Sequence, residues 1–508
     1  MRIPLTGGAY TAHSVTASAQ RCLNLYSEPM PPDQHEPQPQ ALYPTAGSRL
    51  LGTLPKAPIR GIREATNGGL YVVAGDTLYS VAADWAATAL GTITPGLRTP
   101  VSMADNGLTM VLVDGTSSGW TVTLASNAFA AISDPVFRGA DRVDYSDTYL
   151  LFNVPNTPQF HSSDSLAVTP FDSLWFANKE AVSDLLVTLV IASRKVWLLG
   201  QKTTEIWYNS GAPDFPWATE PNVLIDHGIA AKYSAAEADN AVIWLSRNRQ
   251  GQGIVVEGQE YKVERISTYA MEAEFATYDR ISDAIGMTYQ YNGHNFYHLT
   301  FPHVSKTWLY DKTTKLWSEL CWLDSNGTEH RHRANCCAFA RGLIVMGDWQ
   351  NGNLYALDPG VYTDCGNPIK RERGYPHLLA DGKRQFYRQF LADMETGNPA
   401  GIVSTPRAPP LLLRETFAPL LREDGSPFER EAGQDIGDSM VSLRWSDDRG
   451  HSYGNPVLQT IGATGQYSVS MQWQRLGMAR DRVFNLSWSL PTRTALQGAW
   501  IDATPAQT

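Results

Sequence analysis

Two histidines with metal-ligand chemistry stand close together in the 508-residue chain, in the segment Glu329-His-Arg-His332. They occupy positions i and i+2, which lie on one face of an extended backbone. A zinc site needs one or two further ligands, and nothing in the sequence nominates them. We therefore interpret the two imidazoles as polar groups in a solvated turn, and we predict no metal site.

A second polar pattern, near the C-terminus, resembles an Asp box (Ser-x-Asp-x-Gly-x-Thr-Trp). Its members are Ser446, Asp448, Gly450 and Tyr453. In such a turn the carboxylate accepts hydrogen bonds from turn amides and the glycine supplies a positive φ. Asp boxes occur in sialidases, which are propellers, so a propeller glycosidase or sialidase that acts on surface glycans is an alternative function. The pattern occurs once and outside the repeats described below, so we interpret it as a structural turn.

Other sequence signatures of catalysis are missing. The chain has no Gly-x-Ser-x-Gly, His-Glu-x-x-His or Cys-x-x-Cys pattern. The segment Gly251-Gln-Gly253 lacks both the third glycine of a dinucleotide site and the Gly-Lys-Ser/Thr ending of a P-loop. We therefore predict no catalytic residue, no cofactor and no enzymatic activity.

Six basic side chains gather in one region that follows the repeats. They are Lys370, Arg371, Arg373, Lys383, Arg384 and Arg388. The chain as a whole is acidic, with a net charge of −10. Two interpretations stay open: a solvated strand face, or a docking surface for an acidic partner, where charge sets the register and the rate of association.

Composition limits the class of protein. A hydrophobic fraction of 43% is ample for a large core, and the net charge of −10 argues against a surface that grips nucleic-acid phosphates. Five cysteines without regular spacing indicate reduced thiols rather than a disulfide framework. We see no signal peptide, and the longest apolar run, residues 185–192, is too short to span a membrane.

One sequence phrase recurs along the middle of the chain: a polar turn, an apolar strand, a second turn and a second strand. It begins at Gly69, Gly107, Asp147, Lys195, Asn240, Asn295 and Gly342. Four-stranded propeller blades repeat every 40–50 residues or so, and such units bury their apolar faces only by stacking on neighbours. The repeat therefore predicts an all-β chain that contains a β-propeller of six or seven blades. The outer strand of the seventh unit has no clear candidate.

Three regions follow from this pattern. Residues 1–57 are rich in proline and predict an extended N-terminal arm. Residues 58–364 hold the propeller. Residues 365–508 predict a β-sandwich-like platform domain, interrupted by a Pro-rich inserted arm at 397–437.

Five phrases, in order along the chain, resemble those of one family, the packaged-DNA stabilisation proteins of short-tailed (podovirus-type) bacteriophages, also called tail hub or nozzle proteins. The phrases are Arg21-Cys-Leu-Asn-Leu-Tyr-Ser-Glu28, Leu42-Tyr-Pro-Thr-Ala-Gly47, Gly200-Gln-Lys-Thr-Thr-Glu-Ile-Trp-Tyr208 with Phe215-Pro-Trp, Trp445-Ser-Asp-Asp-Arg-Gly-His-Ser-Tyr453 and Leu476-Gly-Met-Ala-Arg-Asp-Arg-Val-Phe484. This chain has Ser27 and Ala46 where the family usually has proline.

The resemblance implies a structural protein of the virion tail, assembled in the host cytoplasm. It implies a homo-hexameric ring below the portal adaptor ring, which retains packaged double-stranded DNA and lets it leave through the lumen without sequence-specific binding. The further neighbours would be a tail tip plug or needle and a tailspike or tail fibre. A third hypothesis, a propeller interaction module of the WD-repeat type, is disfavoured because the Gly-His and Trp-Asp signatures are absent.

Overall fold

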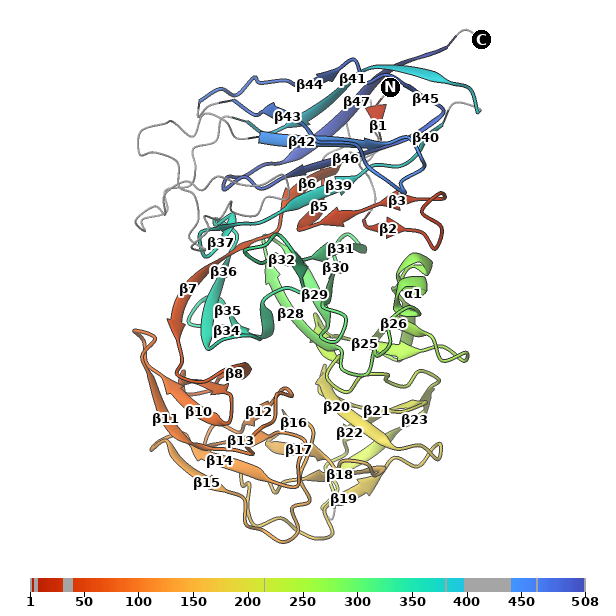
Figure 1. The fold of residues 1–508 in the computed structure, drawn as a ribbon. Helices are drawn as coiled ribbons and strands as arrows, with labels where there is room; N and C mark the ends of the chain where they lie inside the picture. The colour runs from red at the N-terminus through yellow and green to blue at the C-terminus, as the bar shows by residue number, and fades with distance from the viewer. Residues whose placement is uncertain are drawn as a thin grey trace.

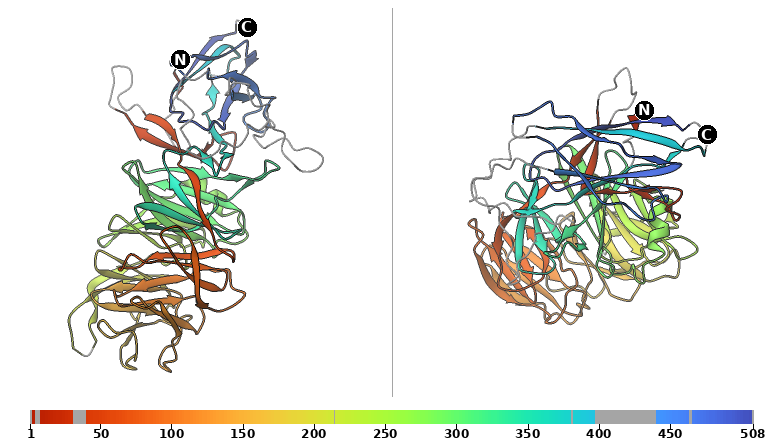
Figure 2. Two further views of the ribbon diagram at one scale, coloured as in Figure 1. Left: turned by 90° about the vertical axis from the view of Figure 1, so that its left-hand side faces the viewer. Right: turned by 45° about the horizontal axis from the view of Figure 1, so that its top comes forward.

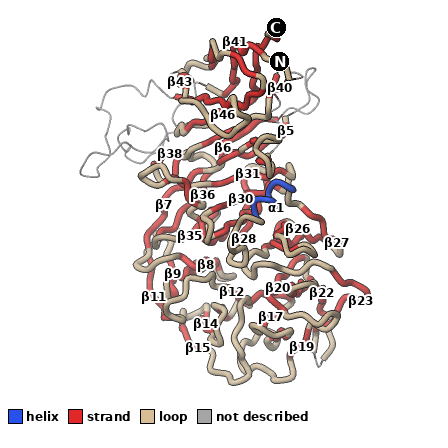
Figure 3. The backbone as a smooth tube through the Cα atoms, turned by 45° about the vertical axis from the view of Figure 1, so that its right-hand side comes forward, coloured by secondary structure: helices blue, strands red, loops and turns tan. Residues whose placement is uncertain are grey.

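The structure is a computed structural model that describes residues 2–3, 8–30, 40–213, 215–379, 382–396, 440–462 and 465–506 (Figure 1). Strands dominate these ranges. The one α-helix among them is α1 (Tyr269–Phe275), which lies at one side of the molecule (Figure 3). No helix in the described ranges has the length and apolar character needed to cross a membrane. The predicted all-β class is confirmed.

Seven four-stranded antiparallel blades form a β-propeller. Blade one consists of β8 (Ile59–Glu64), β9 (Leu70–Ala74), β10 (Thr77–Val81) and β11 (Ala87–Thr92). Blade two consists of β12 (Ser102–Asp105), β13 (Thr109–Val113), β14 (Gly119–Thr123) and β15 (Ala128–Ala131). Blade three consists of β16 (Val143–Ser146), β17 (Tyr149–Asn153), β18 (Gln159–Ser162) and β19 (Phe176–Asn178). Blade four consists of β20 (Leu186–Ala192), β21 (Lys195–Gly200), β22 (Thr204–Asn209) and β23 (Trp217–Ile225).

Blade five consists of β24 (Ala236–Ala238), β25 (Ala241–Arg247), β26 (Gly253–Gln259) and β27 (Lys262–Arg265). Blade six consists of β28 (Ile285–Tyr291), β29 (His294–Phe301), β30 (Lys306–Asp311) and β31 (Leu316–Leu320). Blade seven is β34 (Ala334–Ala340), β35 (Leu343–Asp348), β36 (Asn353–Asp358) and β7 (Gly47–Thr53). Each repeated phrase of the sequence falls on the second strand of a blade. These strands are apolar almost throughout because both of their faces are covered, by the neighbouring blades.

The ring closes where the seventh blade meets the first. The first strands of these blades, β34 and β8, lie side by side. A Cβ added at Gly347 would come 2.3 Å from Cγ2 of Ile59, so glycine permits this close approach. The outer strand of blade seven, which the sequence left without a candidate, is β7 from the N-terminal region, antiparallel to β36.

A β-sandwich of two layers lies on one side of the propeller, and its second layer continues the sheet of blade six (Figure 2). The first contains β1 (Arg2–Ile3), β5 (Leu25–Pro29), β6 (Gln40–Pro44), β41 (Gln385–Met394), β44 (Met471–Gln474), β45 (Met478–Ala479) and β47 (Leu496–Pro505). The second contains β4 (Cys22–Leu23), β39 (Arg371–Gly374), β46 (Asp481–Trp488), β42 (Met440–Ser446) and β43 (Val457–Thr460), with β40 (Leu378–Leu379) beside β46. Their inner faces share a buried cluster that includes Phe390, Trp473, Phe484 and Trp488.

The remaining strands form short pairs. They are β2 (Tyr10–Thr11) with β3 (Ala19–Gln20), β32 (Trp322–Leu323) with β33 (Glu329–His330), and β37 (Thr363–Asp364) with β38 (Asn367–Pro368). The last pair extends the sheet of blade seven, because β37 pairs in parallel with β7. The N-terminal region, predicted as an extended arm, thus supplies strands to both the propeller and the sandwich. The predicted insert at 397–437 lies outside the described residues. All five cysteines are free.

Candidate functional site at the propeller–sandwich junction

The propeller and the sandwich are joined by one continuous sheet. The last strand of blade six, β31, pairs in parallel with β4 through Glu319 and Leu23. Strand β4 pairs on its other side with β39, which in turn pairs with β46 of the sandwich. Backbone hydrogen bonds therefore run from the sixth blade into the C-terminal sheet without a linker.

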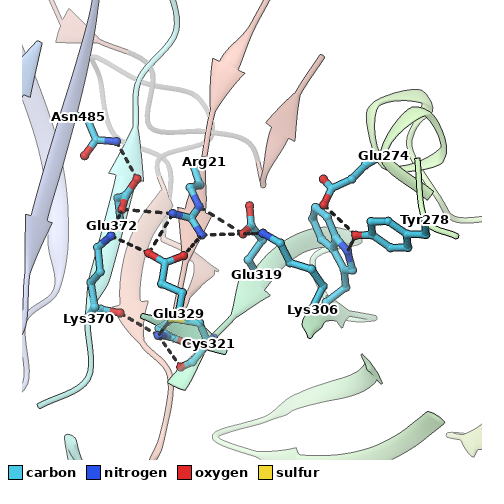
Figure 4. Close-up of polar contacts among 12 residues, drawn as sticks. Arg21, Glu274, Tyr278, Lys306, Glu319, Cys321, Glu329, Lys370, Glu372 and Asn485 are labelled. Atoms are coloured by element: carbon cyan, nitrogen blue, oxygen red, sulfur yellow. Dashed lines mark hydrogen bonds and ion pairs between the residues drawn. The ribbon is translucent and has the colours of Figure 1, made fainter. Parts of the chain in front are cut away.

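Arg21, between β3 and β4, is the centre of an ion cluster at this junction (Figure 4). Its Nη2 lies 3.0 Å from Oε2 of Glu319 and 2.6 Å from Oε2 of Glu329. Its Nη1 lies 3.5 Å from Oε2 of Glu372. These carboxylates come from blade six, the β32–β33 hairpin and sandwich strand β39, so one guanidinium links three parts of the fold.

A second cation completes the cluster. Lys370 Nζ lies 2.8 Å from Oε1 of Glu329 and 2.7 Å from Oε2 of Glu372. The remaining oxygen of Glu372 accepts a hydrogen bond of 2.8 Å from Asn485 of β46. Each of the two shared carboxylates therefore has a cation on either side, which offsets the cost of removing it from water.

Burial and charge oppose each other in the pKa values of this cluster. Burial alone would raise the pKa of Glu329, but hydrogen bonding and attraction to Arg21, with a smaller contribution from Lys370, lower it to about 2. The pKa of Glu372 is lowered by the same two cations against its own burial. Burial alone would lower the pKa of Arg21, and the carboxylates, Glu319 foremost, raise it instead. The charged forms of Glu329, Glu372 and Arg21 are therefore favoured.

Asn24 fixes the chain next to this cluster. It adopts a left-handed conformation, with φ of 53°. Its side-chain amide donates to the carbonyl oxygens of Cys321 at 3.1 Å and Lys370 at 2.8 Å, and its Oδ1 accepts from the Cys321 amide at 3.0 Å. Two residues later, the ring of Tyr26 packs against an aromatic cluster of blade six. The Arg21–Glu28 phrase is thus the segment that fastens the sandwich to the propeller.

The lowered pKa of Glu329 makes the stability of the junction depend on pH. A carboxyl group whose pKa falls from 4.5 to about 2 on folding stabilises the fold fully above pH 4.5, and the contribution is lost as the pH falls toward 2. We expect Glu329→Gln to lower the free energy of unfolding by roughly 3 kcal/mol at pH 7, and by less than half of that at pH 3. Chemical denaturation of both proteins at the two pH values measures this. The exposed carboxylate of Glu180 provides the control, since Glu180→Gln is expected to change stability by about 0.5 kcal/mol or less at either pH.

The predicted docking residues do not form one surface. Arg371 and Arg373 are fully buried, so the prediction that they belong to an exposed face is wrong. Arg371 donates to backbone carbonyl oxygens, including that of Leu490 at 3.0 Å, and Arg373 donates to Oε1 of Gln20 at 3.2 Å. Lys370 is engaged by the carboxylates described above. The charged segment Lys370-Arg-Glu-Arg373 indicated an exposed face because arginine is rarely fully buried.

The other three predicted docking residues, Lys383, Arg384 and Arg388, lie elsewhere. All three are exposed: Lys383 and Arg384 directly precede β41, and Arg388 lies on β41, in the other sheet of the sandwich. No ion pair involves them among the described residues. Their docking role stays a prediction and is developed below.

The Asp-box-like segment closes a turn between β42 and β43. Asp448 Oδ1 accepts hydrogen bonds from Oγ of Ser446 at 2.6 Å and from the amide of Ser452 at 2.9 Å, and Gly450 has φ of 92°. The hydroxyl and amide donors, Ser446 first, lower the pKa of Asp448. Burial raises the pKa of Tyr453 to about 12. The carboxylate is therefore engaged with its own turn.

The two histidines of the first candidate site point to different partners. His330 Nε2 lies 3.1 Å from Oδ2 of Asp324, while Nδ1 of the half-buried His332 accepts a hydrogen bond of 3.2 Å from the Ala334 amide. Burial lowers the pKa of His332 to about 4. The described part of the chain contains no group of three or more His, Cys, Asp or Glu side chains suited to a metal ion.

Comparison with known families identifies the chain. The family model described as Bacteriophage P22 Gp10, beta-propeller, matches residues 1–362 of this chain. A second family model, described as Bacteriophage P22 Gp10, beta-sandwich, matches residues 417–504. A search of curated proteins finds no match. Matches among solved structures include the WD40 β-propeller domain of Doa1, with 14% identity over 61% of this chain and 96% of that chain at a TM-score of 0.38. A chain of the mitotic checkpoint complex is similar at 12% identity, over 62% of this chain and 93% of that chain, with a TM-score of 0.41.

The two family models match the chain in the order in which the structure has its two parts, the propeller first and the sandwich second. The predicted resemblance is therefore confirmed, and so is the predicted combination of a β-propeller with a C-terminal β-sandwich. The chain belongs to the bacteriophage P22 Gp10 family, and it is a structural protein of the tail of a podovirus-type phage.

Proposed function

We propose that this protein forms a homo-hexameric hub, or nozzle, below the portal adaptor ring, where it retains packaged DNA and provides the channel for its ejection. The observation that carries the proposal is the junction. The propeller is closed by an N-terminal strand and is joined to its sandwich by a continuous sheet and an ion cluster, contacts that would stiffen the subunit. A rigid subunit suits a part that bears the pressure of packaged DNA.

Charge supports passage of DNA without adhesion. Residues 58–364 contain 21 Lys and Arg against 33 Asp and Glu, a net charge of −12. Six copies of the whole chain, at −10 each, would surround the DNA with strongly negative protein. Because duplex DNA carries one negative charge every ~1.7 Å, an acidic lumen would not retain it by contact. The remaining partners in this proposal are a tail tip plug or needle and a tailspike or tail fibre, with assembly in the host cytoplasm.

This proposal requires no catalysis. The glycosidase alternative rested on the Asp-box-like turn, and the hydrogen bonds of Asp448 to Ser446 and Ser452 give that carboxylate a structural task. A structural protein is also what the family indicates.

Electron microscopy of the purified protein mixed with its portal and adaptor rings tests the proposal. We expect a six-fold ring stacked on the adaptor, since a ring of this type can depend on its neighbour as a template. Particles that stay single in the presence of both rings would contradict it. A panel of surface glycans incubated with the protein provides the second arm: no sugar release is expected, and release would favour the glycosidase.

A further inference from the structure

Strand β41 carries a bulge at Arg388, next to a break in the strand on its other side. Toward β47, Tyr387 pairs with Ala503 and Gln389 with Asp502, so Arg388 has no partner of its own. On its other edge, β44 ends and β45 begins, joined by a turn in which Arg475 has φ of 59° and Gly477 has φ of 80°. Bulges redirect side chains, and positive φ at a residue other than glycine marks a position held by its surroundings.

A hollow of about 440 Å³ opens at this bulge. Its lining residues are Phe386, Tyr387, Arg388, Gln474, Arg475, Gly477 and Thr504. The floor is rigid: the Tyr387 hydroxyl donates to the Leu378 carbonyl oxygen at 3.1 Å, and the guanidinium of Arg482 lies 4.6 Å from the centre of the tyrosine ring. Arg482 is itself fixed by Asp447, with nitrogen–oxygen distances of 2.6 and 2.8 Å.

Five exposed cations surround the hollow or flank its strands, and we call them, with the hollow, the basic face. They are Lys383, Arg384, Arg388, Arg475 and Arg480. None of the five has an ion-pair partner among the described residues. The exposed acids on β41 and β47 are Asp393 and Asp502, so positive charge prevails. Phe386 and Met478, which are 48% and 39% exposed, add apolar surface at the same place.

We propose that the basic face binds an acidic segment of a neighbouring protein, which places one aromatic or aliphatic side chain in the hollow and its flanking carboxylates on the arginines. Unpaired cations around an apolar hollow match this combination, because charge guides the segment and the apolar side chain anchors it. DNA phosphate would meet the cations but would leave the hollow and Phe386 without a role. This inference rests on the proposed function in one respect: the neighbouring protein is taken to be another component of the phage tail.

Binding of a labelled acidic peptide to the full-length protein tests this. The probe is Asp-Glu-Trp-Glu-Asp with an N-terminal fluorescein, followed by fluorescence anisotropy. We expect saturable binding that weakens at least tenfold in the double variant Arg388→Glu/Arg475→Glu, and about tenfold when alanine replaces tryptophan in the peptide. The matched control is Arg247→Glu/Arg249→Glu, which reverses two exposed arginines of the propeller and is expected to change the affinity less than twofold.

Each other result would overturn the proposal. The wild-type protein could fail to saturate at peptide concentrations of about 1 mM, which means a negligible affinity. Both double variants could lose the same affinity, which would indicate general charge attraction. A labelled DNA duplex could bind at the basic face, be lost in Arg388→Glu/Arg475→Glu and displace the peptide, which would assign the face to DNA. The assay uses the isolated protein, so its outcome is independent of whether a hexameric ring forms.

Discussion

A protein that lacks residues 1–57 is expected not to reach a stable fold. The deletion removes β7, the outer strand of the seventh blade, together with β4, β5 and β6 of the junction and sandwich. It uncovers β36, whose Leu354 is fully buried, and it takes Leu25 and Leu42 out of the sandwich core. This loss exceeds the margin of about 5–15 kcal/mol by which a domain is usually stable.

Solubility and circular dichroism of the shortened protein measure this effect. The edge of β36, once uncovered, presents unpaired backbone groups and favours aggregation. Co-expression of residues 1–57 as a separate polypeptide is the control, and it is expected to restore soluble protein because β7 and β36 pair by backbone hydrogen bonds. A shortened protein that is soluble alone and melts within a few degrees of the wild type would contradict the role assigned to β7.

Replacement of Arg21 by alanine is expected to have the second largest effect. Without the guanidinium, the ion-pair partners left to Glu319, Glu329 and Glu372 among the described residues are Lys306 and Lys370. Removing one partner of a buried ion pair costs about 3–5 kcal/mol, because the charge that remains stays buried. Arg21 is 23% exposed, but Glu319 and Glu372 are buried, and the three carboxylates would have to share two lysines. We expect a loss of stability of this size in chemical denaturation, with the junction more sensitive to proteolysis than the propeller blades.

A surface ion pair supplies the matched control. Arg194 lies 2.8 Å from Asp147 with its side chain 81% exposed. Arg194→Ala removes the same guanidinium from one strong contact, yet an exposed pair contributes about 0–1 kcal/mol. Similar losses in the two variants would show that the Arg21 cluster adds nothing beyond an ordinary surface pair.

The local fold of the propeller could be predicted well from the sequence. The repeat that begins at Gly69, with its two strands and the turn between them, coincides with β9 and β10 and the turn at Gly75 and Asp76. The signal is local, since a two-residue turn and two apolar runs are enough to define a hairpin. The blade count was not accessible in this way. Thr53 of β7 bonds with Asn353 of β36 across 300 positions, and the composition of β7 gives no sign of its partner.

The ion cluster at the junction was likewise not predictable, because it joins residues that are far apart in the sequence. The Arg21–Glu28 phrase was identified as a family signature, but its ion cluster was not, because Arg21 is separated from its carboxylates by 298, 308 and 351 positions. The six predicted docking residues show the converse, since residues that are close in the sequence lie apart in the fold. Lys370, Arg371 and Arg373 are neighbours of Lys383, Arg384 and Arg388 in sequence, but they belong to a different sheet of the sandwich.

The amino-acid sequence by itself determined the all-β class, the repeating hairpins and the division into propeller and C-terminal β domain, because turns and apolar runs act over a few residues. Only the tertiary structure decided that the ring has seven blades, that an N-terminal strand closes it, and which of the basic residues reach the surface. These depend on pairing between segments hundreds of positions apart, and that pairing is selected by the burial and charge compensation of the whole fold rather than by any single segment.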